Sequence, residues 1–403
     1  MKKIIRYFHL NEIGGLELLF AFYIILTGYS YGPVSFTWLV LLIMDIWAIK
    51  RKVVFSYFKP ILYLLLFYLI HELIVLAFYS GFASYHINRV FSSLIVLSSV
   101  FIIVPALDYK KMVGSLYVVA IISMAGLLYH YLLLASGRFS DIHPLTLPFL
   151  PEMSTESRSF EIILRPTSFY WEPAVYATFM MVPLFLALWE KKYLFAGLIL
   201  IFNLLSTSTN GIVLSFLMVV VFVFTQKLGV WSRILIVVSS IFIVSFLLTS
   251  DIFEQGVQKM EIESADVEGS IRLSNGPNLI KRIPASDLIF GIPAANIDDY
   301  YRVTSSMHSA SIGFTDKDTI YVTDFWMVLI KYGIIGLFLY LSVFYSFLKR
   351  QRLIWPYLLV LLVAMFTQSV FLGGTYAFQI IFMLVFCRNI ESQRIRQLGN
   401  VKI

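Results

Sequence analysis

The 403-residue chain is far more apolar than a soluble protein. Hydrophobic residues make up 59% of it and charged residues only 14%, against about 45–50% and about 25% in soluble domains. The apolar runs are continuous, which excludes the alternating pattern of an outer-membrane β-barrel and indicates membrane-spanning helices. The net charge of +7 does not indicate nucleic-acid binding, because most basic residues lie in short connections between the apolar runs.

The apolar runs predict about twelve transmembrane helices, so the expected fold class is an all-α polytopic membrane protein, one membrane domain over residues 1–403. The first run follows basic residues as a signal peptide does. No small-residue cleavage site follows it, so we expect an uncleaved helix. The predicted spans are 14–31, 34–49, 60–80, 87–107, 112–135, 173–189, 193–208, 211–226, 231–249, 320–348, 354–372 and 375–388.

Two long polar segments, 136–171 and 250–319, interrupt this pattern. Neither contains an apolar run long enough to cross a bilayer. The second loop is expected to contain short helices, one of them over 278–289 and ended by Gly291 and Pro293.

The distribution of positive charge predicts the orientation. About twenty of the 31 Lys and Arg residues fall at the termini and in the connections on one side, which places both termini in the cytoplasm and both long loops outside the membrane. Membrane insertion does not require the remaining arginines of the outer loops. We interpret them as ligands of an anionic partner.

The first loop ends in the sequence Arg165-Pro-Thr-Ser-Phe-Tyr-Trp-Glu172-Pro. The proline suits the start of a helix, and the arginine lies at the outer interface among aromatic residues. Arg165 could bind a phosphate bidentately, with Tyr170 and Glu172 as further substrate contacts. The alternative is an aromatic belt at the membrane interface with a snorkelling arginine.

The second loop carries further candidates for substrate contact. Arg272 and Arg282 could instead pair with the acidic residues between 254 and 268, and His308, the histidine of this loop, could be a solvated side chain. The candidate residues in and directly after this loop are Arg272, Arg282, Arg302, His308 and Asp324.

The order of these parts resembles the bacterial O-antigen and capsular polysaccharide polymerases (Wzy) and the related O-antigen ligases. The shared features are two long outer loops, an arginine near an entry to a central span that is similar to the family's R…F.EP and reads Phe-Tyr-Trp-Glu-Pro here, and a second arginine before a loop helix and glycine turn. A loop histidine and a span containing YGIIG follow, here His308 and 332–336. Arg302 and Gly313 also fit the Arg-x10-Gly pattern of the polymerases. The ligases place asparagine after the histidine, whereas Ser309 follows it here, which favours a polymerase.

The resemblance implies a glycosyltransferase of the bacterial plasma (inner) membrane whose active site faces the periplasm or outside. Its donor and acceptor would be oligosaccharides linked to undecaprenyl diphosphate, with a chain-length regulator as a further partner and O-antigen or capsule as product. Arg165 and Arg272 would stabilise the leaving diphosphate, and His308 would be the general base. Neither cofactor nor metal is expected, because Asp316-Lys-Asp318 is more typical of a solvated turn than of a metal-binding D-x-D.

Other functions stay open. A ligase that transfers glycan to lipid A, a flippase for the same lipid-linked sugar and a non-catalytic scaffold are all compatible with about twelve spans. A flippase would place its polar chemistry at the membrane midplane. Several ionisable residues do lie inside predicted spans, and Glu72 and Lys331 are expected to form a pair there.

Overall fold

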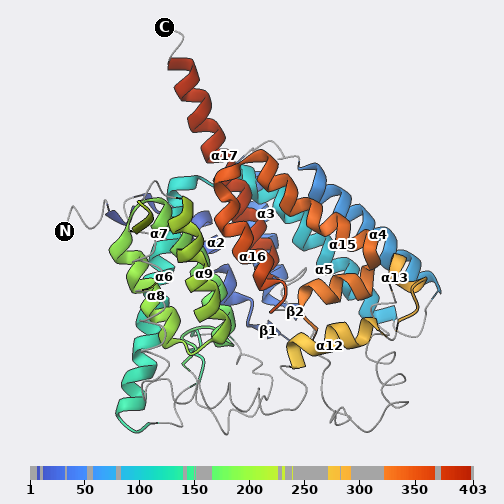
Figure 1. Cartoon of the computed structure of the whole chain (residues 1–403), viewed down its shortest axis with the longest axis horizontal. Helices are drawn as coiled ribbons and strands as arrows, with labels where there is room; N and C mark the ends of the chain where they lie inside the picture. Colours follow the sequence, from blue (N-terminus) through green and yellow to red (C-terminus); the bar gives the residue numbers. More distant parts are fainter. Residues whose placement is uncertain are drawn as a thin grey trace.

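The computed structural model of the chain is a bundle of helices (Figure 1). It describes residues 7–9, 12–31, 34–51, 58–78, 83–138, 143–148, 150, 166–225, 229–231, 238, 271–281, 283–291, 322–367 and 374–400.

The α-helices are α2 (Gly15–Leu26), α3 (Phe36–Lys50), α4 (Lys59–Phe78), α5 (Ala83–Ile103), α6 (Tyr109–Ala135), α7 (Pro173–Trp189), α8 (Tyr193–Leu205), α9 (Thr209–Thr225), α12 (Ile271–Ile280), α13 (Asp287–Phe290), α15 (Asp324–Arg350), α16 (Trp355–Ala364) and α17 (Gly374–Asn400). Two 3-10 turns, η3 (Val104–Ala106) and η7 (Arg352–Ile354), precede α6 and α16. Strands β1 (Ser30–Tyr31) and β2 (Val34–Ser35) pair antiparallel between α2 and α3.

The helical membrane class predicted from composition is confirmed in its coarse form. Within the described part of the chain, α4 over 59–77, α6 and α15 are long and apolar enough to cross a bilayer, and shorter apolar helices accompany them. A helix lies in each predicted span except 231–249, most of which falls outside the described residues.

Several predicted boundaries were wrong. The first helix ends at Leu26, because the chain turns into the β1–β2 hairpin. Helix α16 ends at Ala364 rather than 372, and α17 continues to Asn400, twelve residues past the predicted 388. The last turns of α17 extend beyond the bundle with exposed side chains (Figure 1), so apolar content alone could not predict their helical state.

The helices differ in how much of their apolar surface they bury. Helix α7 and the first half of α17 lie in the core, where most side chains are buried. Helices α3 and α4 each expose a stripe of large apolar residues, including Ile46 and Ile70, both more than half exposed. An apolar face without protein cover suits contact with lipid chains.

One end of the bundle is held together by arginines, and we refer to it as the basic end. Arg51 Nη1 donates to Glu17 Oε1 at 3.1 Å and to the Ala106 carbonyl at 2.8 Å. Arg388 donates to the Val104 and Leu107 carbonyls. These bonds join α2, α3, η3 and α17 where the start of α2 meets the ends of α3 and α5.

The opposite end, the loop end, carries the β1–β2 hairpin, α12 and α13 (Figure 1). Helix α15 begins there and is broken at Gly333, whose backbone angles are φ 68° and ψ −171°. Its first half, 324–332, lies at the loop end, and the second half continues from there toward the basic end (Figure 1). The span predicted over 320–348 thus corresponds to α15, which is long and apolar enough to cross a bilayer, but the sequence did not indicate the break at Gly333.

Candidate functional site

The end of the first loop is fixed on the surface of α6. Thr167 N and Ser168 N donate to His130 Nδ1 at 3.2 and 3.3 Å. Ser168 Oγ donates to the Ser123 carbonyl at 2.7 Å. Gly126 lies between these two positions, and a Cβ there would overlap Ser168 Oγ and lie 2.8 Å from the Phe169 ring. The turn therefore packs directly against α6, with no space between them.

The predicted substrate contact Tyr170 is part of this packing. Its side chain is 1% exposed, and its ring contacts Tyr176 and Phe179. Ser123 Oγ donates to the Val119 carbonyl, so the Tyr170 hydroxyl, 2.9 Å away, donates to Ser123 Oγ. Burial raises the pKa of the Tyr170 hydroxyl well above its ordinary value, which keeps it a donor. Tyr170 thus holds the turn in place and offers no surface to a substrate.

Glu172, the second predicted contact in this motif, is the N-cap residue of α7. Its carbonyl accepts the first bonds of the helix from Val175 N and Tyr176 N. Pro173 follows at the first helical position, where its missing N–H costs nothing. The proline-initiated helix predicted from the sequence is therefore confirmed at this position.

The described parts of the second loop pack on the first half of α15. Leu279 and Ile283 bury their side chains against Val322 and Ile330, which forms a small apolar core apart from the main one. Gly276 of α12 lies against the Trp326 ring so closely that a Cβ would overlap it. Residues following Arg272 in the sequence are thus fixed to the start of α15.

The single helix predicted over 278–289 was wrong. Two helices, α12 and α13, occupy this region, and Pro284 lies between them. A proline removes a backbone donor and disfavours helical geometry in the residue before it, so Pro284 favours an interruption between the two helices. The predicted stop at Gly291 is confirmed, because Gly291 caps α13 with φ 86°.

Helix α13 meets the break in α15, and we name this contact the α13–α15 junction: His71, Phe290, Gly291 and Gly333. A Cβ on Gly291 would overlap the Lys331 carbonyl group, and one on Gly333 would overlap the Ile289 carbonyl oxygen. The Nε2 atom of His71, in α4, lies 3.0 Å from the Phe290 carbonyl oxygen. A carbonyl oxygen only accepts, so Nε2 carries the proton.

Buried polar groups continue from the junction into the bundle. The Tyr332 hydroxyl donates to Glu72 Oε1 at 2.9 Å, and the Tyr332 ring lies 4.4 Å from the Tyr68 ring. Glu72 is 1% exposed. A carboxylate at this depth is stable only with hydrogen-bond donors around it. The predicted Glu72–Lys331 pair stays a prediction, with Lys331 adjacent in the sequence to the observed donor.

Removal of this donor gives a measurable effect. Tyr332→Phe is expected to destabilise the protein by about 1–3 kcal/mol, because it removes a hydrogen bond to a buried charged group. The matched control is Tyr131→Phe, whose hydroxyl donates to the neutral Leu205 carbonyl and contributes roughly 1 kcal/mol. Thermal denaturation of the purified protein in detergent measures both. Equal stabilities of the two variants would contradict a charged Glu72 at this position.

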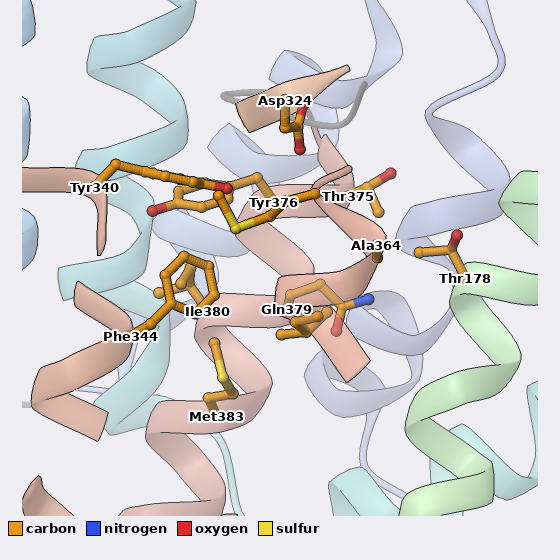
Figure 2. A pocket seen from close by; sticks show the side chains of 12 residues that line it. Thr178, Asp324, Tyr340, Phe344, Ala364, Thr375, Tyr376, Gln379, Ile380 and Met383 are labelled. Carbon is orange, nitrogen blue, oxygen red and sulfur yellow. The ribbon is translucent and has the colours of Figure 1, made fainter. Parts of the chain in front are cut away.

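Asp324, a predicted substrate contact, lies beneath the loop end as the first residue of α15. Its side chain is fully buried and lines a cavity with Tyr340, Tyr376 and Gln379. Figure 2 shows Asp324 above the two tyrosine rings and Gln379 on the other side of them. Asp324 and Tyr340 are sixteen residues apart, about 24 Å along a straight helix. They share one cavity because α15 is broken between them.

The cavity is too small for a sugar. Its volume is about 30 Å³, room for roughly two water molecules. Asp324 is fully buried here, and its predicted role in substrate binding stays a prediction. A carboxylate in the first turn also stabilises the start of α15 through the helix dipole.

The remaining predicted site residues fall outside the described part. Arg165, Arg282, Arg302 and His308 lie in undescribed segments, and for Arg272 only the backbone, in α12, is described. The sequence reasoning missed His130, which binds backbone groups of the first loop, and it counted His71 among the ionisable residues inside spans without predicting its partner, the Phe290 carbonyl of α13. A polar histidine inside an apolar helix was the available signal, since burial there requires a partner.

Among the described residues no group of three or more His, Cys, Asp or Glu side chains is placed to hold a metal ion. Asp316 and Asp318 lie outside these residues. No family model matches the chain, and no curated protein matches it.

Proposed function

We propose that this chain is a polysaccharide polymerase of the bacterial plasma membrane. It would transfer a growing glycan from undecaprenyl diphosphate to a lipid-linked repeat unit at the outer face, without a metal or cofactor. In this proposal about twelve spans cross the bilayer, both termini are cytoplasmic and the loop end faces outward. The positive charge of the connections predicted to be cytoplasmic supports this orientation.

The observation that supports the proposal most is the attachment of both arginine-bearing loops to the same bundle. The turn that directly follows Arg165 is hydrogen-bonded to α6, and α12, which contains Arg272, packs on α15. A lipid diphosphate that leaves during glycan transfer gains negative charge, and guanidinium groups on a fixed backbone can stabilise it. His308 and Arg302 would act from the same loop as Arg272.

Reconstitution tests the proposed activity. The purified protein in proteoliposomes, given a lipid-linked repeat unit, is expected to form a ladder of longer glycans. His308→Ala should lower the rate by about 10²–10⁴-fold, the usual contribution of a general base. The control is His143→Ala, an exposed histidine of the first loop, which should leave the ladder unchanged. A full ladder from His308→Ala would remove this histidine from the mechanism.

A lipid-linked oligosaccharide flippase is the second candidate, because α15 is a discontinuous helix next to the buried Glu72. Broken helices and buried charges are typical of transporter sites. The same proteoliposomes distinguish the two functions: movement of the unextended repeat unit between leaflets with no ladder indicates transport. An O-antigen ligase would instead require a lipid A acceptor for any product.

A further inference from the structure

Three residues of α6 form one continuous stripe against the turn that ends the first loop. Ser123, Gly126 and His130 are spaced three and four residues apart, so they lie on the same face of the helix. Ser123 accepts from Ser168 Oγ, Gly126 leaves the space for Ser168 and Phe169, and His130 accepts from two backbone N–H groups. The described polar contacts of this turn with α6 thus converge on one stripe.

The turn itself has an unusual backbone. Ser168 has φ 57°, in the left-handed region that non-glycine residues rarely occupy. Such a conformation costs about 1–3 kcal/mol and persists only where surrounding contacts hold it. His130 supplies two of these contacts, because its Nδ1 accepts from the two successive amides that flank the Cα of Thr167. The Leu145 amide adds a third through the Ser168 carbonyl at 2.8 Å.

We propose that His130 is a positioning residue, whose Nδ1 fixes the Thr167–Ser168 turn and thereby the backbone that joins Arg165 to α7. Its role requires an acceptor at Nδ1 and no proton there, so the neutral imidazole carries its proton on Nε2. His130 is fully buried, so in this proposal it acts through the turn. The functional part of this inference rests on the proposed polymerase, in which Arg165 binds the diphosphate.

Two substitutions separate the acceptor from the shape of the side chain. His130→Leu fills the space but offers no acceptor. His130→Asn places an amide oxygen close to the position of Nδ1, and that oxygen can accept from both amides. Should His130→Leu fail to fold, Gly126→Ala perturbs the same turn from the same face of α6 with the histidine intact. Gly197→Ala is its control, because a Cβ on Gly197 meets nothing within 4 Å.

Hydrogen–deuterium exchange of the full-length protein measures the positioning directly, whatever the activity. In His130→Leu and in Gly126→Ala the amides of 167 and 168 are expected to exchange at least about tenfold faster, since each lost bond contributes roughly a factor of ten. His130→Asn and Gly197→Ala should exchange as the native protein does. Unchanged exchange in both His130→Leu and Gly126→Ala would overturn the inference.

The polymerisation assay then tests the link to Arg165. We expect kcat of His130→Leu to fall about tenfold or more with KM little changed, because the arginine acts on charge that develops in the transition state. His130→Asn should restore kcat. Faster exchange with native kcat would confine His130 to a structural role and overturn the functional part. If the native protein makes no ladder but His130→Leu still exchanges faster at 167 and 168, the proposed polymerase is refuted and the positioning role of His130 stands.

Discussion

Gly333→Ala is expected to destabilise the protein by roughly 2–6 kcal/mol. The position has φ 68° and ψ −171°, a combination that residues with a side chain adopt only at a cost of about 1–3 kcal/mol. The added methyl group would also overlap the Ile289 carbonyl oxygen, and overpacking at such contacts costs about 1–3 kcal/mol more. Both the break in α15 and the packing of α13 against it would be lost.

Thermal denaturation in detergent, followed by size-exclusion chromatography, measures this effect. Gly197→Ala is the matched control: it lies in α8 with open space around its Cα, and alanine there should stabilise the helix by about 0.5–1 kcal/mol. Gly291→Ala should resemble Gly333→Ala, and the double variant should lose less than the sum, because both act on one junction. A Gly333→Ala protein as stable as the native one would mean that α15 needs no break.

Arg51→Met is expected to destabilise the basic end by about 1–3 kcal/mol, because it leaves a buried carboxylate without its charged hydrogen-bond donor, although Arg51 itself is one-third exposed. Glu17 is fully buried, and Arg51 is its cationic partner at 3.1 Å. Without the guanidinium, the carboxylate keeps one described donor, the Asp108 amide at 3.0 Å. The Ala106 carbonyl would lose its donor as well.

A second substitution isolates the electrostatic cause. Glu17→Gln in the Arg51→Met background removes the uncompensated charge, and the double variant should recover most of the lost stability. Arg350→Met is the control, because its pair with Glu391 at 2.5 Å is about one-third exposed on both sides and should contribute only about 0–1 kcal/mol. Additive losses in the double variant would show that Glu17 carries no charge in the folded protein.

The candidate site shows where sequence reasoning succeeds. Glu172 and Pro173 were expected at the start of a helix, and Gly291 at the end of one, because capping preferences depend on a few neighbouring residues. The roles of Tyr170 and Asp324 could not be predicted in the same way. Both were expected to contact substrate. Tyr170 is buried against Ser123, more than forty positions away, and Asp324 lies beside Tyr340 because their shared helix is broken.

By itself the sequence determined the class of the protein and most of its helices. Long apolar runs must form helices to satisfy their backbone groups in lipid, and this requirement can be read from hydropathy alone. The break of α15 was decided only by the tertiary structure. The sequence YGIIG by itself predicts a continuous apolar helix. In the structure the backbone of 289–291, from a separate loop, packs against Gly333. Likewise, His130 becomes an anchor only when 167 and 168 bring their amides to it, because hydrogen bonds between distant segments have no signature in local sequence.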